Sequence, residues 1–200
     1  RFIYASSSSV YGDDLSLPKM EDKVGNPLSP YAVSKKTNEL YAAIFSNLYD
    51  MEIIGLRYFN VFGPKQNPLG PYAAVIPIFI NKLLKNETCV IFGDGENKRD
   101  FTYVTNVVQA NILAAVSENK LVPGQVFNVA YGATETINNL YKIIKKNLSS
   151  DLSPEYKSPR VGEIKNSFAN INKIKTLLHY HPQTTLNDGI LKAIEWYKKN

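Results

Sequence analysis

The feature that most constrains this chain is a helix start that carries a tyrosine and a lysine. Ser29 and Pro30 directly precede Tyr31, and Lys35 follows the tyrosine by four residues. Serine is a favoured N-cap and proline a favoured first-turn residue, so the pattern predicts that a helix begins here. Residues four apart lie on one helical face, which brings the phenol and the ammonium group together.

This pair has the composition of a proton-transfer site. Lowering the pKa of a phenol from roughly 10 to roughly 7 requires about 4 kcal/mol of stabilisation of the phenolate, and the positive charge of Lys35 acts in that direction. The serine run Ser6 to Ser9 offers a hydroxyl that could relay a proton or hold a substrate oxygen. The four-residue spacing alone favours a buried tyrosine beside a surface lysine, but the serine run and the Ser-Pro start favour chemistry.

The composition is that of a soluble globular protein with room for one sizeable core. The chain has 200 residues, of which 44% are hydrophobic and 20% charged. A net charge of +5 suits an anionic partner, but the lysines are scattered and form no basic stripe of the kind that binds nucleic acid. No apolar stretch approaches the length of a membrane span, so no membrane partner is expected.

Cysteine and histidine usage argues against disulfides and metal. A single cysteine, Cys89, excludes an internal disulfide and fits a reducing cytoplasm, and its apolar surroundings predict a core position. His179 and His181 have no cysteine or carboxylate neighbours at ligand spacing, so no metal site is expected.

Apolar runs and capping residues predict an α/β fold. In the helix that starts at Tyr31, the side chains of Leu40, Ala43, Ile44 and Leu48 are spaced to pack on a sheet. Breaker residues predict a loop over 12–30. The predicted strands are 1–5, 53–58, 88–92 and 125–130, and the predicted helices are 31–48, one ending at 85, 104–118, 136–147, 171–178 and 186–199.

Polar and charged residues at strand ends and turns are candidate ligand contacts. Ligands gather at the carboxyl ends of parallel strands, where Tyr58 and Asn60 stand, although a core aromatic is an equally good interpretation of Tyr58. Arg99 follows a glycine turn and suits bidentate phosphate binding, with a surface ion pair to Asp100 as the alternative. Arg160 and Glu163 could grip a phosphate and a ribose hydroxyl, or form a surface ion pair.

Taken together, these motifs resemble the extended short-chain dehydrogenase/reductases, and within them the nucleotide-sugar epimerases. The resemblance covers essentially the whole chain and rests on several motifs in the family's order. They are Ser7 to Gly12, Tyr31 with Lys35, the run 56–64, Gly93-Asp94-Gly95, and Arg99-Asp100-Phe101.

The resemblance implies the C-terminal part of a Rossmann-type parallel sheet plus a smaller α/β substrate-binding domain. Residues 1–64 would form part of the NAD-binding domain, and residues 65–200 mainly the domain that binds a UDP-sugar, with 104–130 returning to the sheet. The strand at 1–5 would be the fifth of its sheet. No glycine-rich pyrophosphate loop occurs in these residues, so the chain looks like the C-terminal portion of a longer protein.

The resemblance also assigns roles. Tyr31 would take the proton of the sugar 4-hydroxyl while hydride passes to NAD, Lys35 would lower the pKa of Tyr31 and bind the nicotinamide ribose, and Ser7 would hold the reacting oxygen. The implied catalytic residues are Ser7, Ser8, Tyr31 and Lys35; the cofactor contacts are Ser6, Tyr31, Lys35 and Tyr58; the substrate contacts are Ser9, Asn60, Ala74, Val75, Arg99, Arg160, Glu163 and Ser167.

The implied activity is C4 epimerisation of a UDP-sugar, most like the UDP-N-acetylglucosamine type. Ser167 stands where relatives with a bulky aromatic admit only plain hexoses, so it would leave room for an N-acetyl group. A UDP-glucuronate 4-epimerase shares the serine run, although Asn60 argues against it. A sugar-nucleotide 4,6-dehydratase would place an acidic pair where Ser8 and Ser9 stand.

Two further expectations concern assembly and the chain as given. Family members pair through a four-helix bundle that includes the Tyr31 helix, which implies a homodimer. A non-catalytic substrate-binding lobe, lacking its nucleotide-binding half, is the alternative from a different functional class. In that case the purified 200-residue chain would carry no NAD.

Overall fold

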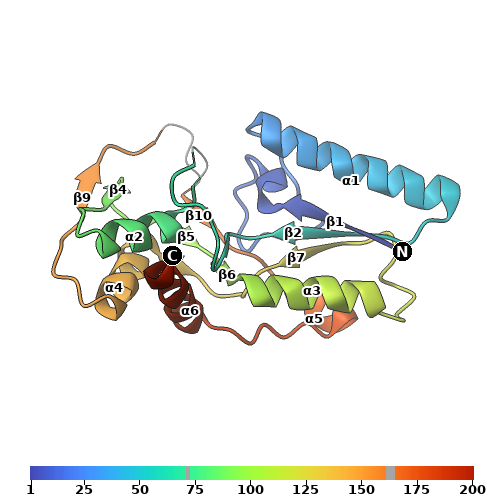
Figure 1. Ribbon diagram of the computed structural model, residues 1–200. Helices are drawn as coiled ribbons and strands as arrows, with labels where there is room; N and C mark the ends of the chain where they lie inside the picture. The colour runs from blue at the N-terminus through green and yellow to red at the C-terminus, as the bar shows by residue number, and fades with distance from the viewer. Residues whose placement is uncertain (71–72, 161–164) are drawn as a thin grey trace.

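A three-stranded parallel sheet forms the centre of one half of the molecule (Figure 1). The computed structural model describes residues 1–70, 73–160 and 165–200. The strands are β1 (Phe2–Ser7), β2 (Ile53–Tyr58) and β7 (Val126–Val129), in the order β1-β2-β7. In this register Ser7 lies opposite Tyr58, so both residues stand at the carboxyl end of the sheet.

Helices cover both faces of this sheet. Helix α1 (Pro30–Tyr49) lies on one face, and α3 (Val104–Val116) and α5 (Asn172–Leu178) lie on the other (Figure 1). Apolar side chains of β2 and β7 are fully buried between these layers and belong to the first hydrophobic cluster, among them Ile54, Leu56, Phe127 and Val129.

Helix α1 begins as the sequence predicts, but it buries a different face. The Ser29 side chain accepts a hydrogen bond from Ala32 N, and Pro30 occupies the first turn. The prediction that Leu40, Ala43, Ile44 and Leu48 pack on the sheet is wrong, because all four are exposed.

The buried residues of α1 are Ala32 and Glu39. Glu39 faces the sheet because its carboxylate forms an ion pair with Arg57 of β2. Helical periodicity reports which residues are apolar, and it cannot show that a charged residue on another stripe has a buried partner.

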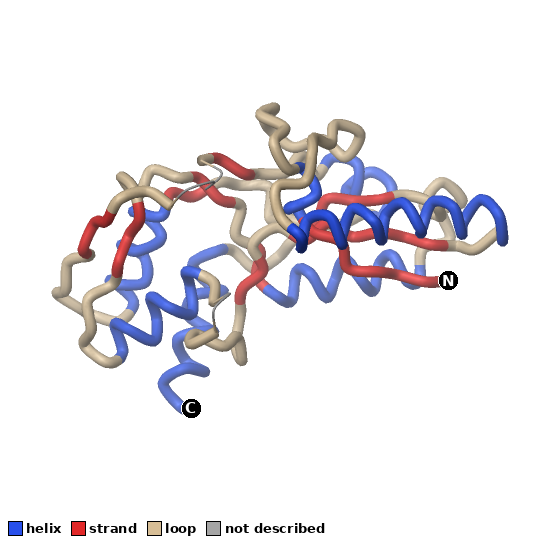
Figure 2. The backbone as a smooth tube through the Cα atoms, turned by 90° about the horizontal axis from the view of Figure 1, so that it is seen from above, coloured by secondary structure: helices blue, strands red, loops and turns tan. Residues whose placement is uncertain are grey.

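The other half of the molecule packs α2 (Val75–Leu84), α4 (Ile137–Asn147) and α6 (Leu186–Lys199) around a second hydrophobic cluster (Figure 2). Cys89 lies in this cluster and is fully buried, as predicted. Short strand pairs complete it: β3 (Val61–Phe62) with β6 (Thr102–Tyr103), β4 (Val90–Phe92) with β9 (Glu155–Lys157), and β5 (Lys98–Arg99) with both β8 (Glu135–Thr136) and β10 (Asn166–Ser167).

The predicted α/β architecture is therefore confirmed, with element boundaries within a few residues. The 3₁₀ helix η1 (Ser8–Tyr11), which the sequence did not predict, continues β1. No helix in the described ranges combines the length and apolarity needed to cross a bilayer.

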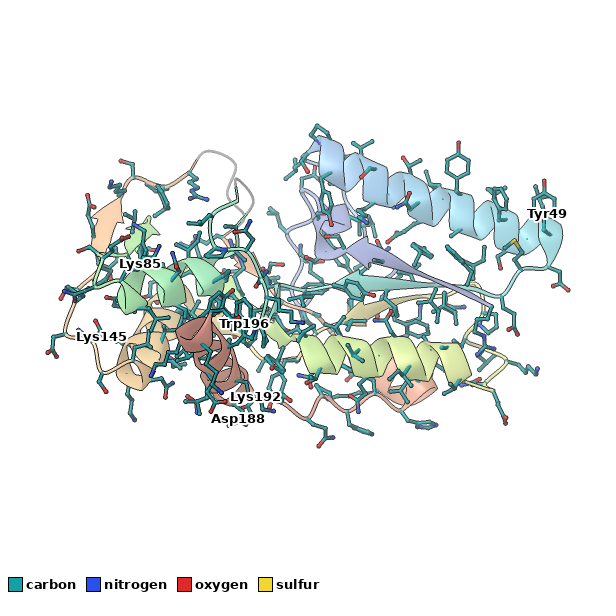
Figure 3. All side chains as sticks on the ribbon, viewed as in Figure 1. Tyr49, Lys85, Lys145, Asp188, Lys192 and Trp196 are labelled. Carbon is teal, nitrogen blue, oxygen red and sulfur yellow. The ribbon has the colours of Figure 1, made fainter. Side chains whose placement is uncertain are left out.

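Helix α6 approaches an aromatic pair closely because it contains a glycine. The rings of Phe62 and Tyr103 meet edge to face at 5.5 Å, and a Cβ on Gly189 would lie 2.8 Å from Phe62 and 2.7 Å from Tyr103. Figure 3 shows Asp188, Lys192 and Trp196 along the same helix. The glycine thus sets the distance between α6 and the β3–β6 pair.

Gly189→Ala should lower the stability of the protein. Alanine is the better helix former by about 1 kcal/mol, but its methyl group would overpack the two buried rings, which costs about 1–3 kcal/mol. Urea denaturation measures the change. Glu195→Ala, at an exposed position of the same helix, is the matched control, and a Gly189→Ala variant as stable as wild type would contradict the prediction.

Candidate active site

The first turn of α1 holds the predicted phenol and ammonium pair together. Lys35 Nζ lies 5.6 Å from the centroid of the Tyr31 ring and donates a 3.0 Å hydrogen bond to the carbonyl oxygen of Ala5 in β1. Tyr31 itself is 55% exposed, which leaves its ring open to a ligand. The ammonium group is therefore fixed between the phenol and the strand that leads into the serine run.

The serine run turns from β1 into η1 and presents its hydroxyls differently. Ser7 Oγ accepts a 3.2 Å hydrogen bond from Ser9 N, so the Ser7 hydroxyl proton remains available for a ligand oxygen. Ser9 Oγ is buried and has no hydrogen-bond partner within the described part of the chain. Ser8 is half-buried at the first position of η1.

Ser6 faces the interior. It is 2% exposed, and its hydroxyl donates a 2.6 Å hydrogen bond to Glu39 Oε1. The Ser6 hydroxyl is thus committed to α1, and a contact between this residue and a cofactor would have to come from its backbone.

The carboxyl end of β2 carries the next two predicted residues. The Tyr58 hydroxyl donates a 3.0 Å hydrogen bond to Asn111 of α3, and burial raises the pKa of Tyr58, so this phenol stays protonated at neutral pH. Asn60 adopts a left-handed conformation with φ 33° and donates a 3.1 Å hydrogen bond to the carbonyl oxygen of Asp100. Asn60 thereby joins the end of the sheet to the other half of the molecule.

A cationic cavity of about 250 Å³ lies between α2, β4 and β5. Ligand pockets usually measure roughly 300–1,000 Å³, so this cavity suits one part of an extended ligand. Lys82, Arg99 and Arg160 make the cavity cationic, and the guanidinium of Arg160 lies 4.0 Å from the centroid of the Phe92 ring. The lining residues are Asn60, Ala73, Val75, Ile78, Phe79, Lys82, Val90, Ile91, Phe92, Arg99, Phe101, Ile137 and Arg160.

The structure thus brings together Asn60, Val75, Arg99 and Arg160 of the predicted substrate residues. Ala74 is the N-cap of α2 and sits between two lining residues without lining the cavity itself. Ser167 lies on β10 opposite Arg99, outside the lining. The predicted residue Glu163 lies outside the described residues.

Phe92 and Lys82 also line the cavity, although the sequence did not predict either residue as a ligand contact. Phe92 ends β4 immediately before the Gly93 turn, and the carboxyl end of a strand before glycine was a usable signal. Lys82 occupies the middle of a helix with no motif around it, so only the fold could reveal its place.

Asp100 is a buried carboxylate that holds the cavity wall to the sheet. It is fully buried and accepts hydrogen bonds from the backbone amides of Tyr131 at 3.0 Å and Gly132 at 3.1 Å. Burial raises the pKa of Asp100 to about 7, against the lowering effect of these amides and that of Ala169. The alternative of a surface ion pair between Arg99 and Asp100 is wrong, because this carboxylate lies in the interior.

Comparison with known proteins identifies the family of this chain. A family model described as "NAD dependent epimerase/dehydratase family" matches residues 1–130. The chain belongs to this family. It is 39% identical over 201 residues to a putative UDP-glucose 4-epimerase of Methanocaldococcus jannaschii, a match that covers 100% of this chain and 64% of that protein.

Two solved epimerase structures are similar over nearly the whole chain. The UDP-N-acetylglucosamine 4-epimerase of Methanobrevibacter ruminantium M1, in complex with UDP-N-acetylmuramic acid, matches with a TM-score of 0.93 and 41% identity, covering 98% of this chain and 62% of that one. The UDP-glucuronic acid 4-epimerase of Bacillus cereus, in complex with UDP-glucuronic acid and NAD, matches with a TM-score of 0.90 and 32% identity, covering 99% and 61%. The chain therefore spans somewhat over 60% of the length of these relatives.

The residues present fit one end of the family's cofactor. Lys35 offers N–H donors beside the end of β1, and the buried Ser9 hydroxyl, unpartnered among the described residues, provides a further polar contact. Both suit a nicotinamide riboside at the carboxyl end of the sheet. The 200 residues contain no glycine-rich fingerprint for the pyrophosphate.

Asp100→Asn should flatten the pH dependence of stability. Because the pKa is raised on folding, the folded state holds more protons than the unfolded state between about pH 4 and pH 7. The free energy of unfolding therefore falls as pH rises through this window, by at most about 1.4 kcal/mol per pH unit. Asparagine removes this titration.

Urea denaturation across this pH window measures the effect. Asp151→Asn, which alters an exposed carboxylate, is the control and should keep the wild-type slope. Parallel profiles for Asp100→Asn and wild type would count against the assignment.

Proposed function

We propose that the protein catalyses NAD-dependent epimerisation at C4 of a UDP-sugar, with UDP-N-acetylglucosamine and UDP-N-acetylgalactosamine as the interconverted pair. The proposal concerns the polypeptide in which these residues are joined to a glycine-rich nucleotide-binding segment, because the chain spans only part of its relatives' length. The observation that carries it is the Tyr31 ring beside Lys35 Nζ, at the end of the strand that leads to Ser7.

In this proposal Tyr31 moves the proton of the sugar 4-hydroxyl. The ammonium group of Lys35 lies 5.6 Å from the centroid of the Tyr31 ring and so places a positive charge beside the group that would accept the proton. Ser7 donates its free proton to the reacting oxygen and holds it in place as its charge changes. The chemistry that bound NAD would supply is reversible hydride exchange with C4. Tyr31 then returns the proton to the sugar oxygen. The configuration at C4 is inverted if the 4-keto sugar has turned its other face to the cofactor before the hydride returns.

The cationic cavity is proposed to hold the nucleotide part of the substrate. Arg99, Arg160 and Lys82 can neutralise a diphosphate, and the apolar wall with Phe92 suits a base. Residues 1–64, with 104–130 in the same sheet, would form the cofactor side, and residues 65–200 mainly the substrate side. Holding the diphosphate in the cavity leaves the sugar free to turn at Tyr31.

The choice of sugar rests on Ser167. It lies on β10 opposite Arg99, a residue of the cavity lining, and its side chain is smaller than an aromatic one. Extra room at this position supports an N-acetylated hexose over a plain one. A UDP-glucuronate 4-epimerase is the competing assignment, because the similar Bacillus cereus protein is a UDP-glucuronic acid 4-epimerase. The assay therefore includes UDP-glucuronate.

The complete protein should interconvert UDP-N-acetylglucosamine and UDP-N-acetylgalactosamine, and Tyr31→Phe should lower kcat by about 10²–10⁴-fold, since it removes the acid–base group. Chromatography of the nucleotide sugars after incubation with each candidate, including UDP-glucose and UDP-glucuronate, measures both. Tyr41→Phe, the same change at an exposed position of α1, is the matched control and should keep kcat.

Each outcome has a distinct meaning. Turnover of UDP-glucuronate alone would replace the N-acetyl assignment with the uronate one. Absence of turnover with all of these sugars would contradict the epimerase proposal and favour a non-catalytic substrate-binding lobe.

We also propose that the complete protein is a homodimer through α1. Its outward stripe is apolar although exposed, with Leu40 59%, Ile44 53% and Leu48 69% exposed, and an exposed apolar stripe of this kind supports an interface at this face. Figure 3 shows Tyr49 at the end of the same helix.

Ile44→Glu should halve the mass found by sedimentation equilibrium, because a charge would be buried in the interface. Asn47→Glu, at an exposed polar position of α1, is the control that should leave the mass unchanged. A monomeric wild type would contradict the dimer.

A further inference from the structure

A buried polar network lies beneath the candidate catalytic groups and contains none of them. Glu39 of α1 and Arg57 of β2 form a two-pronged ion pair, with Arg57 Nε 2.8 Å from Glu39 Oε1 and Arg57 Nη2 2.8 Å from Glu39 Oε2. Both residues are almost fully buried, at 9% and 3% exposed. Burial alone would lower the pKa of Arg57, but its hydrogen bond to Glu39 raises it above the ordinary value, so the guanidinium keeps its charge although it is buried.

The network extends from this pair into three other elements. Ser6 of β1 donates to Glu39. Arg57 Nη1 donates to the Tyr11 hydroxyl of η1 at 3.1 Å, and Tyr11 in turn donates to Asn128 Oδ1 of β7 at 2.5 Å. Burial raises the pKa of Tyr11 to about 12, so its hydroxyl keeps the proton that it donates.

Four members of the network, Ser6, Tyr11, Glu39 and Arg57, are close in sequence to residues of the candidate site. Ser6 precedes Ser7, Arg57 precedes Tyr58, and Glu39 follows Lys35 by one helical turn. Tyr11 ends the short helix that Ser8 begins. A shift in any one of these buried groups would therefore move a group that faces the ligand.

The packing of α1 on the sheet depends on this network more than helix packing usually depends on a buried ion pair. Such a pair is weak evidence for stability, because removing the charges from water offsets much of their attraction. However, the buried residues of α1 are only Ala32 and Glu39, so no large apolar side chain locks the helix onto the sheet. The planar guanidinium and carboxylate meet in one orientation and so fix both the position and the rotation of α1.

We propose that Glu39, Arg57 and Tyr11 are positioning residues that hold the Tyr31–Lys35 pair of α1 in register with the Ser7 turn. They act through the backbone elements that carry those groups and do not touch the substrate. This inference rests on the proposed function for its catalytic consequence, and on the contacts above for its structural content.

Two variants of the complete protein test the proposal. Arg57→Lys keeps the positive charge but loses the guanidinium that forms two hydrogen bonds with the Glu39 carboxylate. Tyr11→Phe removes one hydroxyl and keeps the ring. Arg57→Lys should lower kcat by about 10–100-fold, since small displacements of reacting groups have effects of this size, and Tyr11→Phe should lower it less. KM for the UDP-sugar should stay within about twofold, because the nucleotide cavity contains no member of the network.

The control is a buried polar residue outside the network. Asn106 of α3 is 2% exposed and forms hydrogen bonds with Gln183 N, Thr184 N and the Thr184 carbonyl oxygen. Asn106→Ala should lower the melting temperature and leave kcat unchanged at temperatures where the protein is folded. A loss of kcat equal to that of Arg57→Lys would show that the effect is general destabilisation and would overturn the proposal.

A double variant separates positioning from other effects on the rate. In a Tyr31→Phe background the group to be positioned is gone, so adding Arg57→Lys should change the residual kcat little. An equal fold-loss in both backgrounds, or an Arg57→Lys enzyme with wild-type kcat, would overturn the proposal.

Amide hydrogen exchange gives a readout that does not depend on activity. Arg57→Lys and Tyr11→Phe should speed exchange in residues 6–12 and 30–49 and leave α2, α4 and α6 as in wild type. Uniform acceleration, or none, would contradict the positioning role. If the wild type turns over no UDP-sugar, the proposed function fails while the exchange result still decides whether the network holds α1.

Discussion

The arrangement of the site depends on the buried ion pair between Glu39 and Arg57. It joins the helix that carries Tyr31 and Lys35 to the central strand of the sheet through two hydrogen bonds of 2.8 Å, from Arg57 Nε and Nη2 to the two carboxylate oxygens of Glu39. Because that pair occupies the inward stripe of α1, the apolar side chains of the helix face outward. One polar contact therefore decides which face of α1 meets the sheet and which is available to a partner.

A second set of polar contacts joins the two hydrophobic clusters. Asn60, at the end of β2, donates to the Asp100 carbonyl, while the Asp100 carboxylate accepts from the amides of Tyr131 and Gly132 beyond β7. These bonds hold the segment that contains Arg99 against the carboxyl end of the sheet. The cationic cavity, which Asn60 and Arg99 help to line, is thereby attached to the end of the sheet that also carries Tyr58.

The cationic cavity and the surroundings of Tyr31 differ in their electrostatics. The cavity gathers Lys82, Arg99 and Arg160 around an apolar wall, which suits a charged group that stays in place. At Tyr31 a single ammonium group lies beside a half-exposed phenol, which suits a group that exchanges a proton. Tyr58, by contrast, is hydrogen-bonded to Asn111, and burial raises the pKa of its phenol.

The sequence by itself determined the local features. Ser29 and Pro30 fixed the start of α1, apolar runs fixed the strands of the sheet, and the order of motifs indicated the family, because capping, periodicity and motif spacing are local properties. Only the tertiary structure decided which face of α1 is buried, that Ser6 points inward, that Phe92 and Lys82 line the cavity, and that Asp100 is a core carboxylate. Each of these depends on a partner far away in the chain, such as Arg57 for Glu39 or Gly132 for Asp100, and no local pattern records such a pairing.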